Sequence, residues 1–316
     1  MSRSPALIIR PAEPGEIPAA LKLLLQHESS FNANPIATWE RLLQDWRQGM
    51  WPDHAIMVAC EQHQIRGAMF AQAMPGAVGM IWPPQTDEGP NADAIAVALL
   101  QHGIQQLHRF NLSWLQAILP MHDLKSAALL LRQGFQFLTN LSYMLHTLHR
   151  VEKPTAQGQE LRWISYTPEQ QPLLAATLQL TYQDSLDCPE LNGLRSMADV
   201  LEGHRDTKVW QPHWWRFVLL KDTPIAVVIH AINKELPRPA WELLYIGLVP
   251  QARGQGWGQT ILQQFLNEAK QEGAEHVLLA VDNRNAPALQ LYERLGFEAW
   301  DQRAIYLKIY AKNRTT

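Results

Sequence analysis

The sequence contains few cysteines and no long hydrophobic run. Of its 316 residues only Cys60 and Cys188 are cysteines, too few for a disulfide framework or a cysteine-based zinc cluster. No stretch approaches the ~18 consecutive apolar residues of a membrane-spanning helix, and the N-terminus lacks the apolar region of a signal peptide. These absences predict a soluble protein of a reducing compartment, and we expect a cytoplasmic location without a membrane partner.

The sequence also lacks an excess of charge of either sign. Its formal net charge is -3, with 27 Lys and Arg against 30 Asp and Glu. A nearly neutral chain lacks the basic surface that attracts phosphate backbones, so we expect no nucleic-acid partner. At 316 residues the chain is long enough for two domains that each bury a core of their own.

A strand pattern runs directly into a glycine-rich turn at residues 248–258. The segment reads Leu-Val-Pro-Gln-Ala-Arg-Gly-Gln-Gly-Trp-Gly, and an amphipathic helical pattern follows it. Glycines expose backbone N–H groups, and the first turn of a helix adds unpaired N–H donors and the positive end of its dipole. The turn is therefore predicted to bind a phosphate or diphosphate group.

Two common phosphate-binding motifs do not fit this turn. A dinucleotide fingerprint needs Gly-x-Gly-x-x-Gly, and a P-loop needs Gly-Lys-Ser or Gly-Lys-Thr. The turn resembles instead the Arg/Gln-x-x-Gly-x-Gly/Ala motif of the GNAT superfamily of N-acetyltransferases, with Arg253, Gly256 and Gly258 at the fixed positions. Residues 285–297 are similar to the second family motif, Asn-x-x-Ala-x-x-Leu-Tyr-x-x-x-Gly-Phe, at every fixed position.

The resemblance implies an enzyme that moves the acetyl group of acetyl-CoA to an amine of a small molecule or peptide, without a metal. In the family the glycine turn holds the diphosphate, and two parted strands admit the pantetheine arm. The positions that match the cofactor contacts are Ile246, Gly247, Leu248, Arg253, Gly254, Gln255, Gly256, Trp257, Gly258 and Asn285. We expect backbone groups of Ile246 and Leu248 to pair with the acetyl carbonyl and the pantetheine amides.

Three of these positions have a second interpretation. Gly247 lies inside a strand pattern, where glycine often marks a bulge or the close approach of a ligand. Arg253 is predicted to contact a phosphate, and the alternative is a solvated side chain at the edge of the loop. Asn285 also suits a helix N-cap, a role that is compatible with a pantetheine contact.

Tyr292 is the candidate general acid. It follows Asn285 by seven residues, or two helical turns, so both side chains are predicted on one face of a helix. A phenol near the thioester can donate a proton to the leaving sulfur, and the resemblance implies this role for the tyrosine of the motif. Buried packing is the alternative for this side chain.

Glu242 is the candidate base that takes a proton from the amine. It precedes Leu248 by six residues in a predicted strand, so strand alternation places the two side chains on one face. The resemblance to histone-type members of the family implies a catalytic role, and burial among apolar neighbours would raise the pKa of its carboxyl group. The alternative is that Glu242 is an ion-pair partner or a polar strand residue without a catalytic role. In that case His230, Tyr245 or a water relay would act as the base.

The two halves of the chain resemble each other at their starts and at their ends. The corresponding segments are 7–26 and 161–182, then 130–148 and 292–310. A repeat of this length indicates a duplicated domain. We therefore predict a mixed α/β fold with two GNAT-like domains in tandem, 1–150 and 161–316, joined by a polar linker at 151–160. Chance recurrence of Gly-Phe after a helix is the alternative.

The first half lacks the glycine turn. At the corresponding place, residues 82–90, prolines remove N–H donors, and Asp87 and Glu88 would repel a diphosphate. We interpret residues 1–150 as a degenerate copy that shapes the structure or the substrate site without holding a cofactor.

The acceptor of the acyl group is predicted to enter near residues 181–193. Asp184, Asp187 and Glu190 give this segment a negative face that can attract an ammonium group, and a solvated loop is the alternative. The sequence identifies neither the amine nor the oligomeric state. Two other functions stay open, namely an acyl-CoA-binding regulator without turnover and a transferase of another acyl group.

Overall fold

The chain forms two compact units. The computed structural model describes residues 7–25, 35–149, 151, 159–205, 211–233 and 239–310. Unit 1 comprises Met1–Leu138 and Ala304–Thr316, and unit 2 comprises Thr139–Arg303. Each unit combines parallel and antiparallel strands with flanking helices, which is the mixed α/β class that the sequence predicts. Among the described residues, no helix is long and apolar enough to cross a membrane.

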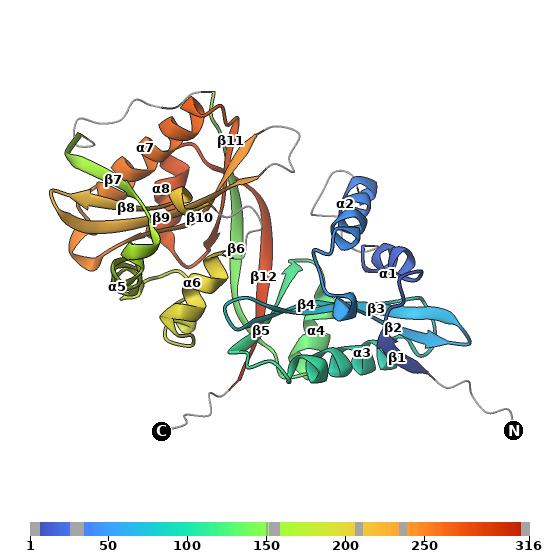
Figure 1. The fold of residues 1–316 in the computed structure, drawn as a ribbon. Helices are drawn as coiled ribbons and strands as arrows, with labels where there is room; N and C mark the ends of the chain where they lie inside the picture. Colours follow the sequence, from blue (N-terminus) through green and yellow to red (C-terminus); the bar gives the residue numbers. More distant parts are fainter. Residues whose placement is uncertain are drawn as a thin grey trace, which may run out of the picture. The chain divides into compact units, whose positions relative to one another are not determined.

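Unit 1 has the strand order β1-β2-β3-β4-β5-β12 (Figure 1). Its strands are β1 (Ile8–Pro11), β2 (Ile56–Glu61), β3 (Gln64–Met74), β4 (Val78–Thr86), β5 (Trp114–Pro120) and the end of β12 (Glu298–Ile309). Its helices are α1 (Ile17–Leu24), α2 (Pro35–Arg47), the short 3-10 turn η1 (Asp53–Ala55), α3 (Ala92–Leu107) and α4 (Leu124–Arg132). The buried residues Leu99 and Leu100 of α3 form a hydrophobic cluster with Met69 and Ile81 of the sheet.

Unit 2 has the strand order β6-β11-β10-β9-β8-β7 (Figure 1). Its strands are β6 (Gln136–Thr147), which begins in unit 1, β7 (Leu161–Ser165), β8 (Trp215–Leu220), β9 (Thr223–Asn233), β10 (Ala240–Leu248) and β11 (His276–Asp282). Its α-helices are α5 (Gln171–Tyr182), α6 (Met197–Arg205), α7 (Trp257–Gln271) and α8 (Ala286–Arg294). Its 3-10 turns are η3 (Pro168–Gln170), η4 (Pro189–Leu191), η5 (Pro212–Trp214) and η6 (Pro250–Ala252).

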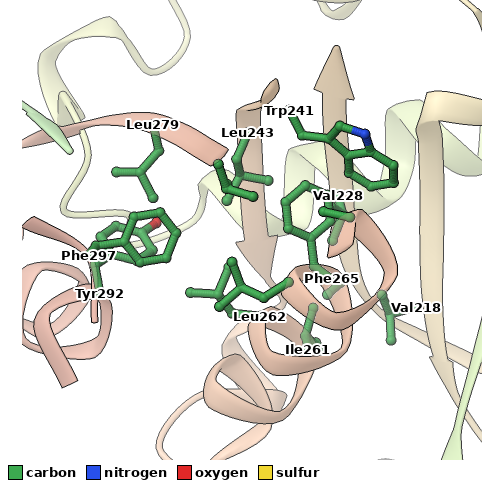
Figure 2. Packing of buried hydrophobic residues seen from close by; sticks show 14 of the residues in the cluster. Val218, Val228, Trp241, Leu243, Ile261, Leu262, Phe265, Leu279, Tyr292 and Phe297 are labelled. Atoms are coloured by element: carbon green, nitrogen blue, oxygen red, sulfur yellow. The ribbon is translucent and has the colours of Figure 1, made fainter. Parts of the chain in front are cut away.

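Helix α7 covers one face of the unit 2 strands, which we call the α7 face. Its buried residues Ile261 and Phe265 are four apart and form a cluster with Val228 of β9 and Leu243 of β10 (Figure 2). Gly273 follows the end of the helix in a left-handed conformation, with φ of +81°. The amphipathic helix predicted after the glycine turn is confirmed, and so is its termination by Gly273.

Helices α5 and α6 cover the opposite face, which we call the α5 face. Leu174 and Leu178 of α5 and Leu201 of α6 form a second cluster with Val227 and Ile229 of β9. Successive residues of a strand point to opposite faces, so Val227 and Val228 separate the two clusters. The sheet of unit 2 is therefore enclosed between two helical layers.

The last strand of each sequence half lies in the compact unit that contains the other half. Strand β6 pairs with β11 from Leu141 to Thr147, inside unit 2. In unit 1, Ala304 and Tyr306 of β12 join the cluster around α3. The compact units therefore do not coincide with the predicted domains 1–150 and 161–316. The linker at 151–160 stays a prediction, because residues 152–158 lie outside the described residues.

Candidate active site

Strands β10 and β11 part halfway along unit 2. They pair in parallel only over Ala240–Leu243 and His276–Leu279. Strand β10 stays paired with β9 as far as Leu248, so its edge towards β11 has no strand partner beyond Leu243 in the described part of the chain. A free strand edge of this kind can hydrogen-bond an extended ligand.

The bulge in β10 lies at Leu244. The sequence predicts a bulge at Gly247 instead. The register with β9 shifts between Leu243 and Tyr245. One extra residue reverses the alternation of side chains beyond it. Ile246 accordingly packs on the α7 face, whereas Tyr245 packs on the α5 face.

This bulge also changes the predicted position of Glu242. Before the bulge, Glu242 lies opposite Ala231, which belongs to the cluster on the α5 face. Beyond the bulge, Leu248 packs on the α7 face. The predicted common face of Glu242 and Leu248 is therefore wrong, and Glu242 shares the α5 face with Tyr245.

Gly247 makes room for the phenol of Tyr245. A Cβ atom at Gly247 would lie 2.3 Å from the Tyr245 hydroxyl oxygen and 2.9 Å from Cβ of Thr181. The same hydroxyl forms a 2.7 Å hydrogen bond with Oγ1 of Thr181. The close approach expected at this glycine is thus made by a neighbouring side chain of the strand.

The glycine turn presents uncovered backbone donors at the start of α7. Gly254 and Gly256 have φ of +73° and +82°, a conformation that glycine adopts without strain. Gly256 is the N-cap residue and supplies no side-chain cap. Within the described residues, the N–H groups of Gly256, Trp257 and Gly258 make no hydrogen bond. These donors and the positive end of the α7 dipole form the geometry of an anion site.

The side chains of this turn serve its structure. Trp257 is 6% exposed and packs in the α7 cluster. The Gln255 amide donates a 2.6 Å hydrogen bond to the carbonyl of Gln251. At Gly258 a Cβ atom would lie 3.4 Å from Leu291 of α8, so a small residue there brings the two helices close together. An anion would therefore be bound here mainly by the backbone.

Arg253 has partners that the sequence did not reveal. Its guanidinium group donates to three carbonyl oxygens, at 3.1 Å to Leu248, 2.9 Å to Thr181 and 3.3 Å to Asp184. The side chain thus ties the end of β10 to the segment after α5 instead of reaching towards a phosphate. The carbonyl of Leu248 is occupied as well, which leaves its N–H group for a ligand. Arg294 donates within its own helix, to the carbonyl of Gln290.

Helix α8 positions Asn285 and Tyr292. Asn285 is the N-cap residue, and its side chain accepts a 3.3 Å hydrogen bond from the N–H of Ala288, so the predicted cap is confirmed. Tyr292 is 7% exposed and lies in the α7 cluster beside Phe297, with a ring distance of 5.6 Å (Figure 2). Burial, and then the negative charge of Asp187, raise the pKa of the Tyr292 phenol, which keeps it protonated at neutral pH.

The candidate bases occupy different faces. Glu242 is half-buried on the α5 face, and its charge helps to raise the pKa of Tyr143 on β6, whose larger cause is burial. His230 is 3% exposed on the α7 face and stacks on Trp241 at 4.3 Å. Burial lowers the pKa of His230 to about 3, so the ring is neutral and enclosed by the core. Burial raises the pKa of Tyr245, which makes it a hydrogen-bond donor and not a base.

A carboxylate network at the end of β11 was not predicted from the sequence. Asp282 is fully buried and accepts hydrogen bonds from Thr139 at 2.7 Å and from the Arg284 guanidinium at 2.7 Å. Burial alone would raise the pKa of Asp282, but these hydrogen bonds outweigh it and lower the pKa to about 2. Asp187, Cys188 and Asp282 bring three ligand atoms within 4.8 Å of one another. Because Arg284 already neutralises Asp282, we assign no metal to this cluster.

Unit 1 also has a parted pair of strands but a different loop. Strands β4 and β5 pair in parallel only over Val78–Met80 and Trp114–Gln116. Residues 82–86, which were predicted as part of a turn, continue β4. Five residues (87–91) lead from β4 to α3, against eight (249–256) from β10 to α7. Asp87 and Glu88 line a cavity of about 770 Å³ at this place.

Known proteins are similar to this chain in sequence and in fold. Residues 178–297 match the sequence model of the acetyltransferase (GNAT) family. The mycothiol acetyltransferase of Thermobifida fusca (strain YX) is 37% identical over 71 residues, which are 22% of this chain and 22% of the relative. That of Corynebacterium glutamicum (strain R) is 27% identical over 131 residues, 38% of this chain and 44% of the relative. The matches thus span less than half the length of these relatives.

Two solved structures resemble the whole chain. A GCN5-related N-acetyltransferase from Sphaerobacter thermophilus has a TM-score of 0.68 at 14% identity, with 96% of this chain and 95% of that chain covered. A tandem GNAT protein from the clavulanic acid biosynthesis pathway has a TM-score of 0.58 at 14% identity, with 96% and 98% covered. At these identities the likeness shows the fold alone, and it covers both units.

Proposed function

Because the chain carries a domain of the acetyltransferase (GNAT) family in a tandem GNAT fold, as its motifs predict, we propose that unit 2 transfers the acetyl group of acetyl-CoA to an amine. The observation that carries the proposal is one arrangement within unit 2. In the described part of unit 2, an edge of β10 without a strand partner leads through the glycine turn to a helix start whose N–H groups are uncovered. The edge suits the amides of pantetheine, and the helix start suits a diphosphate.

In the proposed complex the backbone holds the cofactor. Gly254, Gln255, Gly256, Trp257 and Gly258 surround the diphosphate through N–H groups and the dipole of α7. Backbone groups of Ile246 and the N–H of Leu248 pair with the pantetheine arm and polarise the acetyl carbonyl, and Gly247 lies between them in the strand. Asn285 contacts the pantetheine from the start of α8. Arg253 contributes by tying the end of β10 to the segment after α5.

The reaction runs by direct attack. The neutral amine forms a bond to the thioester carbon, and the tetrahedral intermediate then expels the thiolate of CoA. Tyr292 donates a proton to the leaving sulfur, a role that its raised pKa supports because the phenol stays protonated. Glu242 takes the proton of the amine directly or through water, and its place on the α5 face puts it on the side away from α7 and α8.

The acceptor is an amine of a small molecule or peptide. The relatives that match part of this chain are named mycothiol acetyltransferases, which favours a small molecule. The proposal includes no nucleic acid, no membrane and no metal.

Calorimetry and a thiol assay test the proposal. Purified protein is titrated with CoA and acetyl-CoA, and free thiol is followed with glucosamine, spermidine and lysine amide as acceptors. We expect heat of binding and amine-dependent release of CoA. Binding without release would indicate an acyl-CoA-binding regulator, and release from propionyl-CoA or succinyl-CoA alone would indicate another acyl donor. Absence of any heat with CoA would overturn the proposal.

A further inference from the structure

Asp187 is fixed at the end of β11 by a reciprocal pair of hydrogen bonds. Its Oδ1 accepts the N–H of Asp282 at 3.1 Å. The carboxylate of Asp282 in turn accepts the N–H of Cys188 at 3.0 Å. The segment after α5 is thereby fastened to β11 at the point where this strand has already parted from β10.

The negative charge of Asp187 affects the pKa of tyrosine side chains on both faces of the unit 2 sheet. Its charge contributes to raising the pKa of Tyr182 and Tyr245, which belong to the α5 face, after the larger effect of burial. It does the same to Tyr292, which belongs to the α7 face. Its hydrogen bond to the N–H of Asp282 places Asp187 at the end of β11, beyond the paired part of β10 and β11. From there its charge reaches Tyr292, the proposed proton donor.

Two neighbouring carboxylates, those of Glu190 and Asp282, are paired with an arginine, whereas that of Asp187 has no ion pair among the described residues. Glu190 and Asp282 both bind the guanidinium of Arg284, at 2.9 Å and 2.7 Å. Asp187 is exposed and makes no ion pair with any described residue. The crowding of protein atoms around its carboxylate raises the pKa of Asp187, and Arg284 lowers it. A cation bound at this carboxylate would form a charge-assisted hydrogen bond with it.

We propose that Asp187 binds the ammonium group of the acceptor and presents the amine to the thioester across the gap from Tyr292. This assignment rests on the proposed acetyl transfer. It selects cationic primary amines over alcohols of the same shape, because a hydroxyl group leaves the charge of Asp187 unpaired. The ammonium group first loses one proton to Glu242 or water, and the neutral nitrogen then bonds to the thioester carbon. As the carbon–sulfur bond breaks, the nitrogen releases its second proton to water and the thiolate takes a proton from Tyr292.

The variant Asp187→Asn tests the assignment, since an asparagine Oδ1 can still accept the N–H of Asp282. Using the most active of glucosamine, spermidine and lysine amide, we expect a KM for the amine that is raised about 10- to 100-fold. The Kd for acetyl-CoA, measured by calorimetry, should change less than about twofold. A second readout is inhibition by the hydroxyl analogue of the same amine. The hydroxyl analogue should inhibit Asp187→Asn at least as well as the original protein. The asparagine is uncharged, so binding of a hydroxyl group leaves no carboxylate without a cation.

Glu190→Gln is the matched control, because Glu190 lies three residues away in the same segment and its charge is used by Arg284. It should leave the KM for the amine within about twofold. An unchanged KM in Asp187→Asn, with an active original protein, would overturn the assignment of Asp187. Loss of acetyl-CoA binding in Asp187→Asn would also overturn it, in favour of a purely structural role. An original protein that releases no CoA with any amine would instead contradict the proposed function.

Discussion

In the proposed mechanism Tyr292 combines two roles that the sequence treats as alternatives. Its ring packs between the sheet and α8, and its hydroxyl keeps its proton because burial raises the pKa. Packing and acid catalysis thus use different parts of one side chain. A substitution that removes only the hydroxyl separates the two roles.

Tyr292→Phe should slow the release of CoA by about 10²-fold or more, because the leaving thiolate loses its proton donor. The Kd for acetyl-CoA should stay within about twofold, because the proposal assigns cofactor binding to the backbone of the turn. Turnover by thiol detection and binding by calorimetry measure the two effects. Tyr306→Phe, at another buried tyrosine in unit 1, is the control and should leave both unchanged. Unaltered turnover in Tyr292→Phe would remove this residue from the mechanism.

We predict that His230 affects stability and not catalysis. Burial, and then the charge of Arg216, lower its pKa from 6.5 to about 3, so the folded protein favours the neutral ring. The stability that depends on this neutral ring is present above pH 6.5 and is lost as the pH falls from 6.5 towards 3. Each pH unit in that window costs up to about 1.4 kcal/mol.

His230→Phe should therefore reduce the loss of unfolding free energy on going from about pH 7 to about pH 5. Urea unfolding at the two pH values measures this. His204, whose pKa is lowered to about 4 by burial, contributes a further share in both proteins, so the slope should fall without vanishing. His102→Phe, at an exposed position of α3, is the control. Equal slopes in the original protein and His230→Phe would contradict the prediction.

At the scale of elements, the sequence predicts those helices, turns and caps that depend on residues close together along the chain. The glycine turn, α7 and the cap at Asn285 follow from local patterns, and the structure has all three. The bulge at Leu244 has no local signature, because the register of β10 depends on pairing with β9. The predicted sheet face of Glu242 is wrong for the same reason. Two of the three partners of Arg253, Thr181 and Asp184, lie about seventy residues away along the chain, beyond the reach of any motif.

Arg253→Ala distinguishes the observed role of this side chain from a phosphate contact. Removing three hydrogen bonds to carbonyls should loosen the segment after α5, lower the unfolding free energy by about 1–3 kcal/mol and raise the KM for the amine. The Kd for acetyl-CoA and its dependence on salt should change little. Calorimetry at two salt concentrations measures both. A large loss of affinity with a weaker salt dependence would restore the phosphate contact predicted from the motif.

At the scale of the whole molecule, two units of similar architecture differ in the chemistry of one loop. Both have a parallel strand pair that parts, in unit 1 after Met80 and in unit 2 after Leu243. In unit 1 the strand continues through Pro83 and Pro84, which have no N–H group to pair with a ligand. Its connection to the next helix is three residues shorter and carries carboxylates where unit 2 carries glycines. Unit 1 thus has a similar scaffold with an acidic, proline-containing segment in place of the glycine turn.

One molecule of acetyl-CoA should consequently bind per chain, in unit 2, and calorimetry of the full chain measures this stoichiometry. Gly256→Asp places a carboxylate at the N-cap of α7, where it competes with the diphosphate, so the heat of binding should disappear. Gly273→Asp is the matched control, because Gly273 has a similar φ of +81° but lies beyond the other end of the same helix. Circular dichroism verifies that both variants fold. A stoichiometry of two, or heat that persists in Gly256→Asp with half the original stoichiometry, would show that unit 1 holds the cofactor despite its acidic loop.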